Sequence, residues 1–212
     1  GRQRITDSDK KVLDFSTALR SIVRSDPDII MVGEIRDKET AQIAIDAAMT
    51  GHFLYSTLHT NDALSSIIRL GEHGIGPFLI SESTVCIVAQ RLVRQLCVCK
   101  QEIQIDEEIL RRARAPRSAL EHLTKLGGSA TVYRSSAEGC ARCAGAGYKG
   151  RSGVHEVVEM TPELRTAIVE GKSLEDLEVL VRSQGMGSLR DDAFAKVFAG
   201  STSIEEIQRV VF

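Results

Sequence analysis

The sequence contains no tryptophan and only four prolines, and aromatic residues of any kind make up 4% of its 212 residues. Aromatic rings provide the stacking surfaces that single-stranded nucleic acids need, so their scarcity argues against nucleic-acid binding. Neither charge dominates, because 27 lysines and arginines balance 29 acidic residues to a net charge of −2. No apolar run approaches the ~20 residues of a membrane-spanning helix. We therefore expect membrane contact only through partner proteins.

The remaining composition is that of a globular protein. Hydrophobic residues make up 42% and charged residues 26%, which excludes a disordered chain. The length suits one large domain or one domain with an appendage. The segment Gly1–Asp7 lacks the apolar stretch of a secretory signal, so we expect a cytoplasmic protein with reduced thiols.

The first half of the sequence alternates the patterns of helices and strands. The continuous apolar run Ile29–Val32 is typical of a buried strand, and a second strand is expected at His52–Leu58. The expected helices are one capped by Asp14 or Ser16 and ended by Pro27, one capped by Asp37, one capped by Asn61, and one from Pro77 to Leu96. This alternation indicates an α/β layer fold with a largely parallel sheet.

The rest of the chain changes character twice. We expect residues 1–96 to form the α/β core, 97–150 a small inserted subdomain rich in cysteine and glycine, and 151–212 a helical region. In the last region, Val154–Val158 suggests a strand, and Pro162, Ser173 with Asp176, and Thr202 with Glu205 mark helix starts. Four arginines of the middle region are expected on a solvated helix face: Arg111, Arg112, Arg114 and Arg117.

An acidic residue, Glu34, follows the first expected strand. In α/β folds ligands bind at the C-terminal edge of the sheet. Nucleotide hydrolases place there the carboxylate that orients Mg²⁺ or the attacking water. Taken alone, the simpler interpretation of Glu34 is a surface carboxylate near Arg36.

Two histidines, His52 and His59, stand at the start of the second expected strand and beyond its end. Their odd separation sends them to opposite faces of a regular strand, so they need not form one cluster. His59, followed by Thr60, lies at a strand-to-helix edge that adjoins Glu34 if the two strands are neighbours. A lone histidine there is as consistent with a structural role as with a catalytic one.

Four of the five cysteines form two close pairs, Cys97/Cys99 and Cys140/Cys143. The chain between the pairs is long enough to fold back and complete a tetrahedral Cys₄ site, and such pairs favour a structural Zn²⁺ over four unrelated thiols. Cys86 stands apart in the apolar segment after Pro77, where we expect a core residue.

Several segments together carry a family resemblance. They are Leu19–Ser21, Asp26–Asp28, Val32–Asp37, Glu39–Ala41, Thr50–His52, Ser56–Asn61, Pro77–Ile80, Gln90–Arg94 and Gly147–Arg151. In this order they closely resemble the bacterial secretion and pilus-assembly ATPases, that is, the type II secretion ATPases of the GspE type and the type IV pilus extension ATPases of the PilB type. The resemblance covers most of the chain.

The resemblance implies the C-terminal half of a RecA-like P-loop NTPase core, with an inserted four-cysteine zinc subdomain and a C-terminal helical region. It implies a homohexamer that hydrolyses ATP with Mg²⁺, with Glu34 as the Walker B carboxylate and His52 and His59 as a histidine box near the phosphates. Arg36 and Thr60, in the same motifs, become candidate nucleotide-binding residues. The family also implies work at the inner membrane with a platform protein and cytoplasmic adaptors, in secretion or in assembly of a pilus or pseudopilus.

The cysteine pairs depart from the family in one respect. The secretion and extension branches carry a four-cysteine metal subdomain with C-x-x-C pairs, whereas the first pair here is Cys97-Val98-Cys99. Residues i and i+2 of a strand point the same way, so both thiolates can still reach one ion.

The phosphate-binding loop G-x-x-x-x-G-K-[ST] is absent from the 212 residues. Gly171-Lys172-Ser173 imitates its end, but Thr166 stands where the first glycine belongs and a helix precedes it, so we expect a helix end followed by a cap. In the family the loop precedes the segment near Gln3. We therefore expect the chain to begin inside the ATPase domain and to be inactive alone.

A zinc-stabilised protein-binding module without catalysis is the alternative function. The acid and the imidazole expected at neighbouring strand edges favour the motor ATPase.

Overall fold

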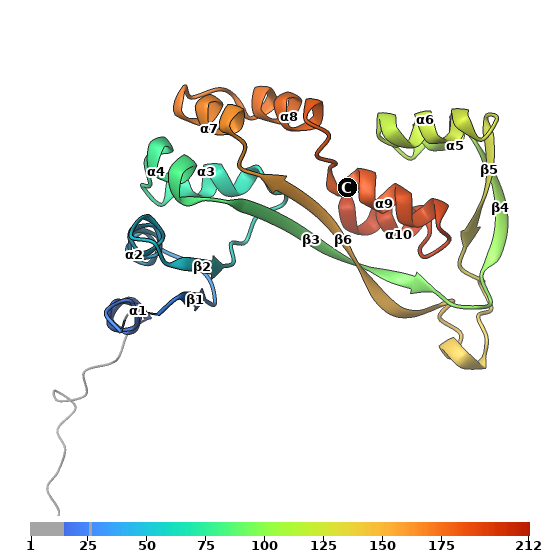
Figure 1. The fold of residues 1–212 in the computed structure, drawn as a ribbon. Coiled ribbons are helices and arrows are strands. Elements are labelled where there is room, and N and C mark those ends of the chain that lie inside the picture. Colours follow the sequence, from blue (N-terminus) through green and yellow to red (C-terminus); the bar gives the residue numbers. More distant parts are fainter. Residues whose placement is uncertain (1–14, 26) are drawn as a thin grey trace, which may run out of the picture. The chain divides into compact units, whose positions relative to one another are not determined.

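The computed structural model describes residues 15–25 and 27–212, apart from the side chains of residues 15 and 16 (Figure 1). The expected caps Asp14 and Ser16 lie outside the described side chains. The chain forms two compact units. One holds the described residues up to Thr60 with Ser65–Val85 and Met160–Lys172, and the other holds Asn61–Leu64, Cys86–Glu159 and Ser173–Phe212. The expected division into 1–96, 97–150 and 151–212 cuts across both units and stays a prediction.

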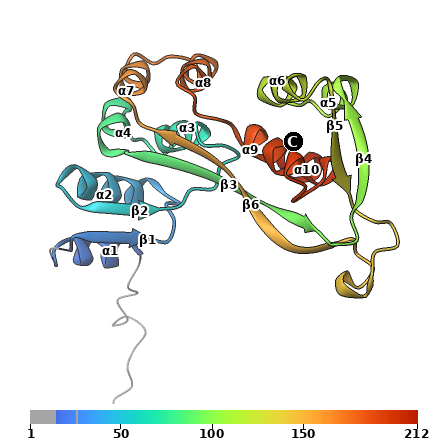
Figure 2. The same cartoon turned by 45° about the vertical axis from the view of Figure 1, so that its right-hand side comes forward.

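The first unit is a small α/β layer. Its elements are α1 (Phe15–Val23), β1 (Ile29–Val32), α2 (Lys38–Met49), β2 (Phe53–Ser56), α3 (Ser65–Glu72), α4 (Pro77–Ser83) and α7 (Pro162–Val169). β1 and β2 are parallel, with Ile29 opposite Phe53 and Val32 opposite Ser56 (Figure 2). Their C-terminal ends therefore meet at one edge of the sheet.

One face of β1 anchors this layer. Ile30 and Val32 are buried with Leu19 of α1 and Ala47 of α2 in one apolar cluster. Burial of the leucine, isoleucine and valine side chains contributes about 1.5–3 kcal/mol each. The packing holds β1 against both helices and so fixes the residues that follow its last position.

The two expected strands and the helix capped by Asp37 are confirmed. The expectation that β1 is buried on both faces is wrong, because Ile29 and Met31 are exposed while Ile30 and Val32 are buried. The amide of Thr40 donates to the Asp37 carboxylate at 2.8 Å, which satisfies one of the free amides at the start of α2. The cap expected at Asn61 is wrong, since α3 begins at Ser65 after an irregular turn.

The long helix expected from Pro77 to Leu96 is wrong in its second half. α4 ends at Ser83, and Cys86–Leu96 is strand β3. Burial along β3 has a period of two: Ala89 and Val93 are buried, whereas the alternate residues are exposed. The exposed face also carries apolar residues. Together with the buried ones they give the sequence the apolar spacing of a helix. Cys86 lies on that exposed face and is not the core residue that we expected.

The second unit contains two antiparallel ribbons, β3–β6 and β4–β5. Its further elements are β4 (Gln101–Asp106), α5 (Glu107–Arg112), α6 (Arg117–Lys125), β5 (Ser129–Arg134), the 3₁₀ turn η2 (Ala141–Cys143), β6 (Tyr148–Glu159), α8 (Leu174–Ser183), α9 (Leu189–Phe198) and α10 (Ile204–Val211). α9 and α10 lie along the β3–β6 ribbon (Figure 1). Among the described strands, only β1 and β2 form the expected parallel pairing.

Ion pairs along α5 and α6 explain the arginine-rich stretch. Arg111, Arg112 and Arg117 pair with glutamates four residues away in the same helix, and all three are exposed. Such pairs contribute only a few tenths of a kcal/mol each. The expected solvated helix face is confirmed for these three arginines. Arg114 is exposed too, but it lies in the turn between α5 and α6 with a left-handed backbone, φ +53°, and is not part of a helix face.

The helix starts of the C-terminal part are confirmed with one exception. Thr161 caps α7, and Ser173 and Asp176 form a reciprocal capping box at α8. Gly171, with φ of +71°, ends α7, so the Gly-Lys-Ser triplet is a helix end and a cap. The box expected at Thr202 is wrong because the Thr202 hydroxyl donates to the carbonyl of Arg94, and Ser203 caps α10 instead.

The residues around that cap cover the outer edge of β3. Leu96 donates its amide to the carbonyl of Ser201, and Arg94 donates its amide to Glu206 at 2.9 Å. Glu206 is fully buried, and its carboxylate also accepts from the guanidinium groups of Arg94 and Arg209. Polar groups at the strand edge are thereby paired rather than left in an apolar interior.

We expect this cluster to make stability depend on pH. Burial alone would raise the pKa of Glu206, but hydrogen bonds from Arg209 and Arg94 outweigh it and lower the pKa to about 2. A depressed carboxyl pKa stabilises the fold above pH ~4.5, and the contribution, about 3 kcal/mol, is lost as pH falls from there toward 2. Glu206→Gln should flatten the dependence of the free energy of unfolding on pH in this range. Glu205→Gln, its exposed neighbour, should leave it unchanged, and equal effects of both would contradict the assignment.

Within the described ranges, no helix combines the length and apolar composition needed to cross a bilayer.

Candidate functional site

The residue after β1 begins a short excursion of the chain at the sheet edge. Beyond the paired residues Val32 and Ser56, the amide of Ile35 donates to the carbonyl of Thr57 at 3.0 Å. Gly33 and Glu34 thus lie between the last paired residue of β1 and this hydrogen bond. The hydroxyl of Thr57 donates to the carbonyl of Gly33 at 2.6 Å. These bonds fix the peptide that carries Glu34.

The Glu34 carboxylate lies between two cationic or potentially cationic groups. His59 Nε2 lies 3.0 Å from Glu34 Oε2, and the Arg36 guanidinium pairs with Oε1. The hydrogen bond from Arg36, with a smaller contribution from His59, lowers the pKa of Glu34 despite partial burial, and Glu34 in turn raises the pKa of Arg36. The site therefore holds an ionised carboxylate, the form required to orient a metal-bound or attacking water.

The exposure of the three groups differs in a way that suits a ligand site. The Glu34 side chain is 24% exposed, whereas those of Arg36 and His59 are 74% and 86% exposed. The carboxylate is sheltered at the sheet edge, and the two groups that hold it face solvent. The structure thus contains the contacts of both interpretations of Glu34. One is the ion pair with Arg36, and the other is the acid–imidazole pair at neighbouring strand ends.

The other two expected residues lie apart from this contact. His52 precedes β2, and its Nδ1 lies 3.0 Å from the Ala47 carbonyl at the end of α2. It is therefore at the opposite end of β2 from His59. The hydroxyl of Thr60 lies 2.9 Å from that of Ser66 on α3. The expected roles of His52 in the histidine box and of Thr60 in nucleotide binding stay predictions.

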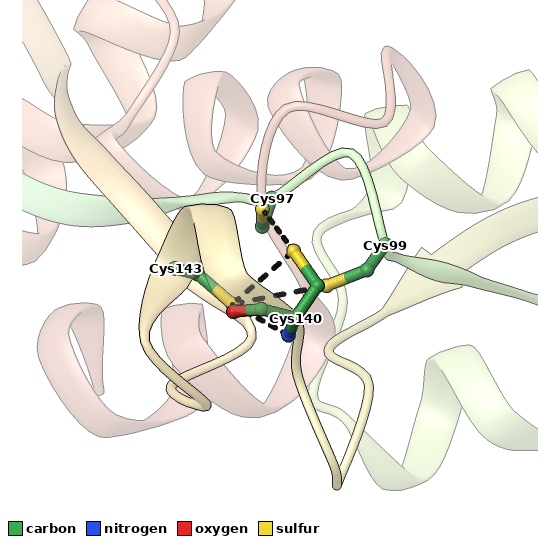
Figure 3. Close-up of side chains that lie close together, drawn as sticks. All are labelled: Cys97, Cys99, Cys140 and Cys143. Carbon is green, nitrogen blue, oxygen red and sulfur yellow. Dashed lines mark hydrogen bonds between the residues drawn. The ribbon is translucent and has the colours of Figure 1, made fainter.

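The four paired cysteines converge on one point (Figure 3). Their sulfur atoms all lie within 4.8 Å of one another, and three of the separations are 3.7 Å (Cys97–Cys140), 3.9 Å (Cys99–Cys143) and 3.8 Å (Cys140–Cys143). Tetrahedral zinc with Zn–S bonds of ~2.3 Å places its ligands ~3.8 Å apart. The donor set and its spacing are compatible with Zn²⁺.

Tight turns present these thiols. Cys140–Cys143 surround the 3₁₀ turn η2, where Ala144 adopts a left-handed backbone and Gly139 has φ of +62°. A Cβ on Gly139 would lie 2.4 Å from the backbone of Gly145, so glycine is required for this close approach. Amides of Cys140 and Gly147 donate to the Cys143 sulfur and lower the pKa of that thiol to about 6.

The backbone at Cys97 and Cys99 differs from the strand that the sequence predicts. They lie in a turn after β3 rather than on a strand. The Cys97 amide donates to the Gly147 carbonyl and its carbonyl accepts from Lys100. This turn brings both sulfurs to the cluster despite the missing residue of the C-x-C pair. Burial and the neighbouring thiols raise the pKa of Cys99 to about 12, and a bound divalent cation would favour its thiolate.

A sequence profile of the family described as "Type II/IV secretion system protein" matches residues 1–209. The chain belongs to this family. It is 46% identical over 196 residues to the type IV pilus assembly ATPase PilB of Thermus thermophilus, covering 92% of this chain and 21% of that protein. It is 44% identical over 199 residues to the type II secretion system ATPase E of Vibrio cholerae, covering 93% and 37%. The resemblance to GspE-type and PilB-type ATPases is confirmed.

Solved structures support the fold class. The pilus retraction motor PilT with bound ADP aligns with a TM-score of 0.59 at 23% identity, over 91% of this chain and 42% of that one. The ATPase DotB of Legionella pneumophila gives 0.61 at 23% identity, over 92% and 42%. The expected RecA-like α/β fold with a four-cysteine cluster is therefore confirmed. The chain spans less than two fifths of the length of each of the two curated relatives.

Sequence reasoning missed two residues at these sites. Thr57, which holds the Gly33 carbonyl, stands inside the motif Ser56–Asn61 but carries no charge or imidazole to single it out. The sequence feature that could have identified Thr57 is its position: it carries a hydroxyl directly after the last residue of the strand, at the edge of the sheet where ligands bind. Gly147 supplies an amide to Cys143 and a carbonyl to Cys97, and its signal was its place in a glycine-rich stretch after the second cysteine pair.

Proposed function

We propose that this chain provides the water-activating carboxylate of a motor ATPase that drives protein secretion or the assembly of a pilus or pseudopilus. The observation that carries the proposal is the Glu34–His59 pair at the shared edge of β1 and β2, with Arg36 on the other carboxylate oxygen. Membership of the secretion family and relatives named as ATPases support it.

In this proposal Glu34 orients the attacking water and takes up its proton, because its carboxylate is ionised and sheltered. The side chains of His59 and Arg36 face solvent, so in this proposal they exchange Glu34 for phosphate oxygens when nucleotide binds. Bound Mg²⁺ would neutralise charge on the phosphates. We propose that His52 and His59 couple the state of the γ-phosphate to movement of the subunit, and that Thr60 contributes to nucleotide binding.

A phosphate loop has to complete this site, and none of the 212 residues forms one. Without such a loop the β- and γ-phosphates have no cradle of backbone amides. We propose that the full-length protein supplies it, in keeping with the greater length of the relatives. The isolated chain is then inactive.

The four cysteines are proposed to hold a structural Zn²⁺, because all coordination positions are taken by protein thiolates and none is left for a substrate. The ion would supply folding energy to the turns that contain the cysteines.

The assembly is also part of the proposal. We infer a homohexamer in the cytoplasm, peripheral to the inner membrane, that acts on a platform protein with cytoplasmic adaptors. The machines named in the relatives' descriptions support this placement. Contact with the membrane runs through those partners.

ATP turnover tests the proposal most simply. The full-length protein should release phosphate from ATP in the presence of Mg²⁺, and the 212-residue chain should not, because the cradle is missing. Zinc content should be about one ion per chain in both preparations. A zinc-loaded full-length protein that fails to hydrolyse ATP under any assembly state would favour the binding module instead.

A further inference from the structure

The excursion that carries Glu34 is bonded at both of its ends to one residue of the neighbouring chain segment. The carbonyl of Thr57 accepts from the Ile35 amide at 3.0 Å, after the excursion, and its hydroxyl donates to the Gly33 carbonyl at 2.6 Å, before it. Glu34 is the residue between these two attachment points. The arrangement therefore limits where its carboxylate can lie.

We propose that Thr57 is a positioning residue that sets the Glu34 carboxylate between Arg36 and His59. Thr57 and His59 are separated by one residue in the segment after β2, so the same stretch of chain bonds the Gly33 carbonyl and the Glu34 carboxylate. Only the expected effect of Thr57 on catalysis rests on the proposed function. The contact geometry itself is independent of it.

The side chain and the backbone of Thr57 make separable contributions. Removing the hydroxyl breaks the bond to Gly33 and keeps the bond from Ile35, so the start of the excursion is freed while its end stays attached. The Glu34 carboxylate then samples positions away from Arg36 and His59. A displacement of about 1 Å at a reacting centre is enough to cost about a hundredfold in rate.

The first test measures Glu34 directly in the 212-residue chain, by titration of its side-chain carboxyl in ¹³C NMR spectra. In the wild-type chain the pKa of Glu34 should lie below the usual range, chiefly because of Arg36. Thr57→Val should move it toward the ordinary value, and Thr57→Ser, which keeps the hydroxyl, should restore the wild-type titration. Thr166→Val, which removes a hydroxyl bonded within α7, should leave it unchanged.

If Thr57→Val does not fold, Thr57→Ala removes the same hydroxyl without adding an apolar branch. A folded hydroxyl-free variant in which Glu34 titrates as in the wild type would overturn the proposal.

The second test uses the full-length protein. Thr57→Val should lower kcat for ATP hydrolysis by roughly tenfold and leave KM within about twofold, because a displaced carboxylate impairs the chemical step rather than nucleotide binding. Thr57→Ser should retain most of the activity. A rise in KM with kcat unchanged would contradict the positioning role. Failure of the wild-type protein to hydrolyse ATP would reject the proposed function, while the titration of Glu34 would still decide the role of Thr57.

Discussion

Replacement of Glu34 by glutamine is expected to reduce ATP turnover by the full-length protein by roughly 100- to 10,000-fold, the range typical of a lost general base. Glutamine has nearly the shape of glutamate but cannot take up a proton from water, and it loses the ion pair with Arg36. Binding of ATP should stay within about threefold, since the proposed phosphate loop, and not Glu34, provides the cradle for the phosphates. Phosphate release under saturating ATP and titration with a fluorescent ATP analogue measure the two effects.

Glu39→Gln is the matched control. Glu39 belongs to the same unit and pairs with Arg20 at 2.6 Å on the surface, so its replacement removes one negative charge and one ion pair but none of the contacts of Glu34. Turnover should change by less than about twofold. Equal rates for the wild type and Glu34→Gln would show that Glu34 has no part in hydrolysis.

Replacement of Cys140 by serine is expected to abolish zinc retention and disorder the residues 97–150. Structural zinc sites in small domains contribute on the order of 10 kcal/mol to folding, which exceeds what the turns around the cysteines can supply themselves. The α1–β1–α2–β2 layer has its own apolar cluster and should remain folded. Elemental analysis measures the zinc, and hydrogen exchange resolved along the chain measures the order of each segment.

Cys86→Ser serves as the control because Cys86 is exposed on β3 and outside the cluster. It should keep about one zinc per chain and the wild-type exchange pattern. A stably folded Cys140→Ser protein with unchanged exchange in 97–150 would show that the ion is not structural.

The chemistry-bearing residues were predictable because their types are rare and their order is informative. An acid after one apolar strand, a histidine after the next, and two close cysteine pairs define both sites without knowledge of any distance. The cap at Asp37 and the capping box at Ser173 were equally local, since each depends on residues no more than three positions apart.

The wrong predictions concern residues whose structure depends on contacts far away in sequence. The sequence pattern predicts a helix at β3 because the exposed face of this strand carries Val88 and Leu92, and only pairing with β6 decides the period. Thr202 could not be excluded as a cap without the Arg94 carbonyl, which is more than a hundred residues away in sequence. The burial of Glu206 could not be predicted for the same reason, because one of its two arginine partners, Arg94, lies on β3, far away in sequence.

The turn that carries Cys97 and Cys99 was predicted in part: the residues were identified correctly, but their backbone geometry was not. Spacing identified all four cysteines of the cluster, but the geometry of Cys97 and Cys99 comes from a turn held by Gly147, not from a continuing strand. The four sulfur atoms therefore still converge although the first pair departs from C-x-x-C. The spacing of the two cysteines alone does not reveal the turn that makes this possible.

The most direct test of the motor assignment is a double-mutant cycle at Glu34 and His59, with single-turnover ATP hydrolysis by the full-length protein as the readout. If the imidazole acts through the carboxylate 3.0 Å away, His59→Ala should slow hydrolysis, and adding it to Glu34→Gln should cause almost no further loss. Multiplicative losses, or a His59→Ala enzyme as fast as the wild type, would mean that the two side chains do not work as one site.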